Sequence, residues 1–161
     1  MDVDGILTDG RIVMDDEGRE TKFFDVRDGF GIVMFRKAGF KTAIISARPS
    51  RTILHRAKDL SIDKVVTDTY PKIGAYESML KEFGFKDEEA CYMGDDLPDL
   101  DIMQKVGFAV SVPDGRPEVR QSAHYVTTHR GGRGAVREVI EMIMKAQTLR
   151  NWPVAKEKRK K

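Results

Sequence analysis

Near its start the chain reads Asp2-Val3-Asp4-Gly5-Ile6-Leu7-Thr8-Asp9-Gly10, and this stretch decides how the fold is interpreted. If residues 1–4 end a strand, the alternation of side chains puts Asp2 and Asp4 on the same side of it. Close carboxylates repel each other unless a cation or a proton relieves them, and Mg²⁺ does so because it prefers hard oxygen ligands. The alternative is an acidic turn before a hairpin, and this stretch alone leaves both interpretations open.

Three later elements place polar side chains at or near the ends of short apolar strands. Ser46 follows the apolar run 42–45, Lys72 precedes a helical pattern, and the sequence GDDLPD (94–99) follows the apolar run 90–93. Taken singly, these are equally well a turn residue, a solvated lysine and an acidic first turn of a helix. In open α/β sheets, however, ligands bind at the carboxyl ends of the strands. The order acid pair, hydroxyl, lysine, acid pair therefore predicts one site.

Phosphoryl transfer is the chemistry that fits this set of side chains. Asp2 attacks phosphorus, and Asp4 protonates the leaving alkoxide and then activates water against the aspartyl-phosphate. Ser46 and Lys72 hold the phosphate oxygens. Mg²⁺ is expected on Asp2, Asp95 and the backbone carbonyl of Asp4. Such catalysis consists mainly of positioning and electrostatic stabilisation.

The four motifs resemble those of the haloacid dehalogenase superfamily of phosphohydrolases, and most closely its small 3-deoxy-D-manno-octulosonate 8-phosphate (KDO 8-phosphate) phosphatases. The resemblance runs from Asp2 to about Gln147. It implies that Asp2 is the nucleophile and Asp4 the acid/base, with Asp96 supporting the metal site. It rests on five motifs: DVDGILTDG (Asp2–Gly10), DVRDGFG (Asp25–Gly31), SARPS (Ser46–Ser50), GDDLPDL (Gly94–Leu100) and GGRGAVREV (Gly131–Val139).

The pattern of elements predicts an α/β fold, a Rossmann-like haloacid dehalogenase core with a central parallel sheet. We expect a single domain over residues 1–148, with a β-hairpin at about 11–26 in place of a cap domain, and a basic, flexible tail over 149–161. Expected strands are 41–45, 64–66, 90–93, 108–112 and 124–126, and expected helices are 28–38, 50–60, 73–83, 98–105, 117–122 and 135–145.

Two features of the first third depart from larger relatives. Only a hairpin separates the first acid pair from Ser46, so something else must cover the site. The resemblance implies a homotetramer for this purpose, and the adjacent Phe23 and Phe24 give the hairpin apolar residues on both faces. In addition, the superfamily has a central apolar strand before its first Asp, whereas only Met1 precedes Asp2 here. We expect the chain as given to lack most of that strand.

Substrate specificity is expected from Arg48, because a guanidinium binds a planar carboxylate bidentately and a 2-keto-3-deoxy sugar acid carries one. The resemblance supports this choice, since relatives acting on nine-carbon sugar acid phosphates tend to carry glutamate there. Thr8, Arg27 and Asp28 are further candidates for substrate contacts. The alternatives are a phosphatase for another sugar phosphate, a phosphorelay receiver, whose phosphorylated Asp would stand later in the chain, and an inactive module.

Composition excludes several classes of protein. A formal charge of +2 over 161 residues gives no indication of nucleic acid binding. There is no run of about 18 apolar residues and no signal peptide, so we expect neither a membrane span nor secretion. The single cysteine, Cys91, cannot form an internal disulfide and is expected as a buried apolar filler, which suits a reducing cytoplasm.

Overall fold

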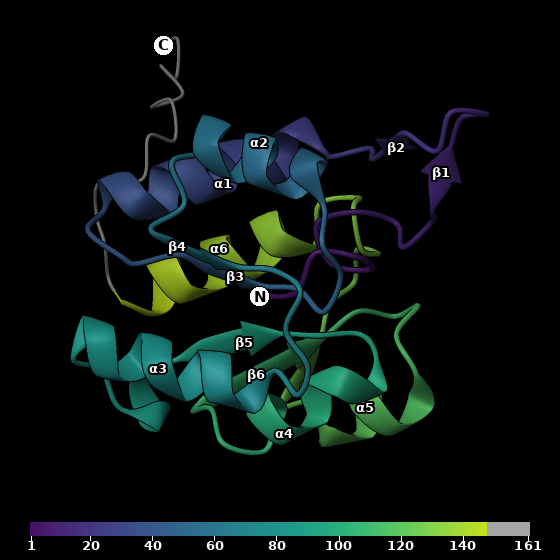
Figure 1. Ribbon diagram of the computed structural model, residues 1–161. Coiled ribbons are helices and arrows are strands. Elements are labelled where there is room, and N and C mark those ends of the chain that lie inside the picture. Colours follow the sequence, from purple (N-terminus) through teal and green to yellow (C-terminus); the bar gives the residue numbers. More distant parts are fainter. Residues whose placement is uncertain (148–161) are drawn as a thin grey trace, which may run out of the picture.

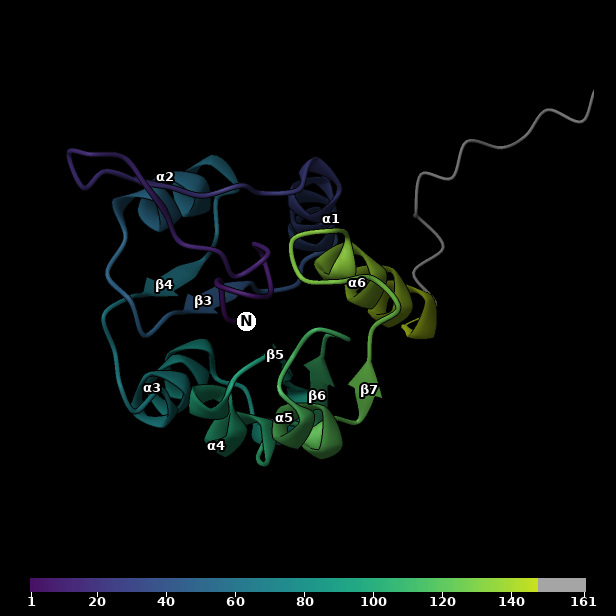
Figure 2. The ribbon, with the colours of Figure 1, turned by 90° about the vertical axis from the view of Figure 1, so that its right-hand side faces the viewer.

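The computed structural model describes residues 1–147, so the expected tail over 149–161 lies outside the described residues. The parallel strands lie between two layers of helices, with α1, α2 and α6 on one side and α3, α4 and α5 on the other, while the hairpin strands project beyond them (Figures 1 and 2). The helices are α1 (Val26–Lys37), α2 (Arg51–Asp59), α3 (Ile73–Phe83), α4 (Leu100–Met103), α5 (Pro117–Ser122) and α6 (Ala135–Ala146), with 3₁₀ turns η1 (Asp87–Glu89) and η2 (Leu97–Asp99). The strands are β1 (Val13–Met14), β2 (Glu20–Thr21), β3 (Ala43–Ile45), β4 (Lys64–Val66), β5 (Cys91–Met93), β6 (Phe108–Ser111) and β7 (Tyr125–Val126).

The parallel pairing confirms the predicted α/β fold, but the strands form two separate groups. β3 pairs with β4, and β5, β6 and β7 pair in that order, all in parallel. Met1 lies between the groups: its backbone bonds Ala43 and Ile45, while the Asp2 amide donates to the Met93 carbonyl at 3.0 Å. The chain start thus occupies the strand position between β3 and β5 (Figure 2).

The position of Cys91 corrects the expectation that it is a buried filler. Cys91 opens β5 and is exposed. Its strand pairs with β6 on one edge. On the other edge, the backbone bond within residues 1–147 reaches only Met93, two residues further along. An apolar strand pattern cannot show which end of the strand remains uncovered.

Each helix layer buries its own apolar core against the strands. One core contains Val3, Ile6 and Ile44 with the buried faces of α1, α2 and α6, and the other joins α3, α4 and α5 to Ile45 and Tyr92. In α6 the buried residues Val136, Val139, Ile140 and Met144 recur at helical spacing. No helix among the described residues is long and apolar enough to cross a bilayer.

The hairpin is shorter than the predicted 11–26 region. Its antiparallel strands β1 and β2 pair Val13 with Thr21 and Met14 with Glu20. α1 begins at Val26, earlier than expected, because the Asp25 side chain caps it by accepting the Arg27 amide at 2.7 Å. Several apolar side chains on or beside the hairpin and on α1 are exposed, namely Ile12, Val13, Met14, Phe23, Val26 and Phe30.

Candidate active site

The described fold brings the predicted motifs to one end of the strands. Asp2 and Asp4 stand in the loop that starts between β3 and β5, Ser46 directly follows β3, and Asp95 follows β5. The backbone amide of Ser46 donates to the Val66 carbonyl at the end of β4, and the loop after β4 leads to Lys72. Ser46 and Asp95 therefore stand at the carboxyl ends of parallel strands, where ligands bind in open α/β sheets.

Three carboxylates and a lysine form what we call the floor cluster: Asp2, Lys72, Asp95 and Asp99. The Lys72 ammonium lies 3.0 Å from Asp2 Oδ2 and 2.7 Å from Asp99 Oδ1. The Tyr92 hydroxyl also donates to Asp99 Oδ1, at 2.8 Å. One carboxylate oxygen from each of the three aspartates lies within 4.8 Å of the others. The cluster thus holds three acids against one ammonium.

Burial and mutual repulsion oppose ionisation of the floor cluster. Desolvation and the charge of Asp99 raise the pKa of Asp2 to about 6. Desolvation and the charges of Asp2 and Asp99 raise the pKa of Asp95 to about 8. Although burial lowers the pKa of Lys72, the charges of Asp2 and Asp99 outweigh it, and the pKa rises. An additional cation would relieve this repulsion.

The donor set fits a hard divalent cation such as Mg²⁺. Besides the three converging carboxylates, Asp95 Oδ1 is buried and accepts no hydrogen bond within the described chain, so it is available as a ligand. Gly5 permits this arrangement: its φ is +90°, and a Cβ there would lie 2.0 Å from Asp95 Oδ2. A larger residue at this position would separate the Asp2 loop from Asp95.

Asp99 is a member of the cluster that sequence reasoning missed, although it stands in the quoted GDDLPDL motif. Its side chain is fully buried, and Oδ2 accepts the backbone amides of Asp95 and Asp96 at 3.1 and 3.3 Å. The signal was an acid four residues after Asp95, which a tight turn brings back to it. The Asp96 carboxylate instead caps η2, accepting the Leu97 amide at 2.8 Å.

A second group, the hairpin cluster, consists of Asp4, Glu20, Lys22 and Arg48. The Lys22 ammonium lies 2.6 Å from Asp4 Oδ1 and 3.1 Å from Glu20 Oε1. Arg48 lies 3.1 Å from Glu20 Oε1 and 3.7 Å from Asp4 Oδ2. Two carboxylates therefore face two cations, and the fully buried Lys22 side chain is central to the group.

The surroundings of Glu20 favour its ionised form. Burial opposes ionisation, but the hydrogen bond from the Ser50 hydroxyl, at 2.6 Å, and the adjacent Lys22 ammonium outweigh it and lower the pKa of Glu20. Sequence reasoning assigned no role to Glu20 or Lys22. The available signal was their spacing of two, which puts both side chains on one face of a strand.

The other predicted substrate residues have different surroundings. Thr8 is buried, with its hydroxyl 3.4 Å from Asp4 Oδ1, and Arg48 donates its backbone amide to the Ser46 hydroxyl at 3.3 Å. Arg27 pairs with Asp25 and donates to the Arg133 carbonyl. Both carboxylate oxygens of Asp28 accept backbone amides at the start of α6, from Gly134 and Arg137. The structure thus gives Asp28 a helix-capping role.

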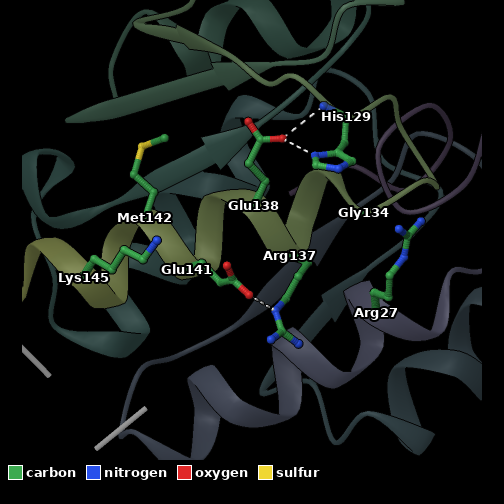
Figure 3. Close-up of a pocket in the computed structure, with 8 residues that line it drawn as sticks. All are labelled: Arg27, His129, Gly134, Arg137, Glu138, Glu141, Met142 and Lys145. Atoms are coloured by element: carbon green, nitrogen blue, oxygen red, sulfur yellow. Dashed lines mark hydrogen bonds and ion pairs between the residues drawn. The ribbon is translucent and has the colours of Figure 1, made fainter. Parts of the chain in front are cut away.

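The hollow drawn in Figure 3 is lined by no residue of either cluster. It has a volume of about 410 Å³ and lies along α6, with Arg27 contributed by α1. A second hollow of about 440 Å³ is lined by Asp9, Phe23, Arg27 and Arg133, among others. Neither hollow contains Asp2, Asp4 or Asp95, so the chemistry is assigned from the side-chain clusters.

Comparisons with known proteins agree with this geometry. The model of the haloacid dehalogenase-like hydrolase family matches residues 62–140. The chain is 42% identical over 146 residues to the 3-deoxy-D-manno-octulosonate 8-phosphate phosphatase of Yersinia pestis, covering 91% of this chain and 78% of that protein. The corresponding phosphatase of Escherichia coli K12 is 40% identical over 147 residues, with the same coverage.

Solved structures extend the comparison. The phosphatase of the same name from Moraxella catarrhalis, in complex with magnesium, phosphate and KDO, superposes with a TM-score of 0.90 at 44% identity, covering 92% of this chain and 85% of that one. The cobalt-bound deoxy-D-mannose-octulosonate 8-phosphate phosphatase of Haemophilus influenzae has a TM-score of 0.88 at 37% identity, covering 91% and 86%.

Proposed function

The chain belongs to the haloacid dehalogenase-like hydrolases, within the KDO 8-phosphate phosphatases, and from this premise we propose that it hydrolyses KDO 8-phosphate to KDO and inorganic phosphate with Mg²⁺. One observation supports this most directly: the carboxylates of Asp2, Asp95 and Asp99 converge around Lys72 at the ends of parallel strands. The alternatives, a nine-carbon sugar acid phosphate and a phosphorelay role, are not favoured by the relatives.

In the proposed first step, a carboxylate oxygen of Asp2 attacks phosphorus and the sugar leaves as an alkoxide. Lys72, 3.0 Å from Asp2 Oδ2, orients the nucleophile and, with Ser46, holds phosphate oxygens. Asp4 gives its proton to the leaving oxygen. In the second step Asp4 takes a proton from water, which then attacks the aspartyl-phosphate.

The proposed metal ligands are Asp2, Asp95 and the backbone carbonyl of Asp4, with Asp96 in support. We add Asp99 as a candidate, because one of its oxygens lies with those of Asp2 and Asp95. The bound Mg²⁺ would neutralise charge on the phosphate oxygens.

Arg48 is proposed to bind the substrate carboxylate, and Thr8, Arg27 and Asp28 are kept as proposed substrate contacts. Arg48 is suited to this role because it is partly exposed and stands beside Asp4, which serves the leaving-group oxygen. Its pairing with Glu20 holds the guanidinium at this place before substrate arrives. Arg27 and Asp28 are weaker proposals, since both already make structural contacts.

We further propose a cytoplasmic homotetramer. The exposed apolar side chains of Ile12, Met14, Phe23 and Phe30 offer a surface for a second copy, and such a copy would cover a site that has no cap domain. A single exposed cysteine is compatible with a reducing compartment. Light scattering is expected to give four times the chain mass, and a fully active monomer at micromolar concentration would contradict the assembly.

A phosphate-release screen over sugar phosphates, with and without Mg²⁺, tests the proposed reaction. We expect KDO 8-phosphate to be hydrolysed faster than aldose phosphates, which lack a carboxylate, and we expect a chelator to abolish turnover. Full activity of the chelator-treated protein, or equal rates on all sugar phosphates, would overturn the assignment.

A further inference from the structure

Asp4, which acts as acid and base in the proposed function, has two carboxylate oxygens in unequal surroundings. Oδ1 lies 2.6 Å from the Lys22 ammonium and 3.4 Å from the Thr8 hydroxyl. Oδ2 accepts no hydrogen bond within residues 1–147, and the Arg48 guanidinium lies 3.7 Å away, beyond hydrogen-bond distance. One oxygen is therefore anchored, and the other is left without a hydrogen bond.

The Lys22 side chain is held in a fixed position by burial and by ion pairs. Its side chain is fully buried although it stands just after a short, exposed hairpin strand. Burying an ammonium is costly unless it is paired, and Lys22 is paired on both sides, with Asp4 and with Glu20. Glu20 is in turn fixed by the Ser50 hydroxyl, which caps α2. The anchor is thereby connected to a helix of the core.

We propose that Lys22 is a positioning residue for Asp4: it holds Oδ1 and so reserves Oδ2 for proton transfer. In the first step the proton on Oδ2 passes to the leaving alkoxide, and in the second step Oδ2 takes a proton from the attacking water. Lys22 neither gives nor takes a proton in this scheme. This inference rests on the proposed function, because it assigns the roles of Asp4 within it.

The leaving group distinguishes this role from a merely structural one. A sugar alkoxide needs the proton from Asp4, whereas p-nitrophenolate leaves without one. Water attack in the second step needs Asp4 with either substrate. In Lys22→Met, p-nitrophenyl phosphate should therefore still phosphorylate Asp2, while hydrolysis of the aspartyl-phosphate becomes slow.

The expected kinetics of the variants follow from this difference between the two leaving groups. General acid–base catalysis contributes about 10²–10⁴-fold, and we expect Lys22→Met to lose roughly 10- to 100-fold in kcat on KDO 8-phosphate, with a smaller change in KM. With p-nitrophenyl phosphate, rapid mixing should show a burst approaching one nitrophenolate per active site, larger than in the wild type. Lys22→Arg should recover part of the lost kcat.

Arg19→Met is the matched control on the same hairpin. Arg19 is exposed and pairs with Asp15 and Glu17, so its loss alters the hairpin without touching the hairpin cluster. It should leave kcat on both substrates unchanged. If Lys22→Met does not fold, Lys22→Gln carries the same burst measurement.

The measurements distinguish a failure of the proposed phosphatase function from a failure of the proposed role of Lys22. A wild-type protein that releases no phosphate overturns the proposed function itself. An active wild type with normal kcat in Lys22→Met overturns the role of Lys22, as does a variant that loses burst rate and steady-state rate equally. Slower turnover together with a larger burst supports the proposal.

Discussion

The floor cluster and the hairpin cluster each take one acid from the same loop, Asp2 and Asp4 respectively, yet their buried charges are balanced differently. The floor cluster sets three carboxylates against the ammonium of Lys72, and the pKa values of Asp2 and Asp95 rise. The hairpin cluster balances two carboxylates with two cations, and the pKa of Glu20 falls. An added cation would relieve the repulsion in the floor cluster, whereas the hairpin cluster already has as many cations as carboxylates.

This difference indicates that the floor cluster gains most from binding a metal ion, whereas the hairpin cluster is already arranged for the reaction. Ligands that bring positive charge, such as Mg²⁺, should stabilise the floor cluster strongly, because they relieve repulsion already present in the folded chain. The hairpin cluster has its partners in place, so its groups need little reorganisation during the reaction. Variants of the two clusters should therefore respond differently to metal and to pH.

The largest effect is expected from replacing Asp2 of the floor cluster or Asp4 of the hairpin cluster, the two acids of the proposed mechanism. Asp2→Asn removes the proposed nucleophile and should abolish turnover, a loss of several orders of magnitude. Asp4→Asn, on the hairpin side, should let the aspartyl-phosphate persist, because water is no longer activated. Mass measurement after rapid quenching would detect it, and substantial steady-state activity in Asp2→Asn would refute the assigned role.

Arg48→Ala tests whether the hairpin cluster selects the substrate. If Arg48 binds the carboxylate, kcat/KM on KDO 8-phosphate should fall by roughly 10- to 200-fold, taking about 1.5–3 kcal/mol for a hydrogen bond to a charged group. Hydrolysis of p-nitrophenyl phosphate, which has no carboxylate, should change little. Arg48→Lys should restore only part of the activity. Equal losses on both substrates would make Arg48 a phosphate ligand or a loop anchor.

A metal titration followed by thermal unfolding distinguishes the clusters directly. Saturating Mg²⁺ should raise the Tm of the wild type by several degrees, since a ligand at 100 times its Kd adds about 2.7 kcal/mol. Asp95→Asn should lose most of this shift, yet unfold no earlier than the wild type in a chelator. Glu20→Gln, the matched acid of the hairpin cluster, should keep the shift and be destabilised with and without metal. Equal Mg²⁺ responses in both variants would contradict the comparison.

A pH dependence of the metal-free protein tests the repulsion within the floor cluster without any ligand. The pKa values of Asp2, about 6, and Asp95, about 8, lie above those of the unfolded chain, so the folded state binds more protons in this window. Their contribution to stability is present at about pH 4 and is lost as the pH rises to about 8, with a slope of at most about 1.4 kcal/mol per pH unit for each proton. Denaturant titrations from pH 5 to 8 should show this slope in a chelator. Mg²⁺ should flatten it.

Local sequence patterns were sufficient to predict many of the helices and strands. The strand Lys64–Val66 and the helices Ile73–Phe83 and Pro117–Ser122 have the predicted bounds, because turn residues and apolar periodicity mark both ends. The carboxylates of Asp2 and Asp95 also lie close together, with Lys72 beside Asp2. The exposure of Cys91 was missed, since it depends on what lies beside the strand edge.

The missed site residues share a physical reason. Asp99 joins the floor cluster only through a tight turn that brings its carboxylate to the amides of Asp95 and Asp96. Lys22 and Glu20 reach the hairpin cluster only because the hairpin folds back over α2, where Ser50 holds Glu20. The partners of Lys22 and Glu20 lie 18 and 30 residues away in sequence, whereas those of Asp99 lie four and three residues away. Hydrophobic periodicity carries no information about either kind of contact.

The bridge that Met1 and Asp2 form between the two strand groups has a consequence for heat inactivation. The Asp2 amide bonds Met93 of one group, and Met1 bonds Ala43 and Ile45 of the other. An opening that breaks these bonds would shift Asp2, the proposed nucleophile, relative to Lys72. Local openings of this kind require less free energy than global unfolding. On warming, turnover should decline at temperatures where the helical circular dichroism signal is still unchanged.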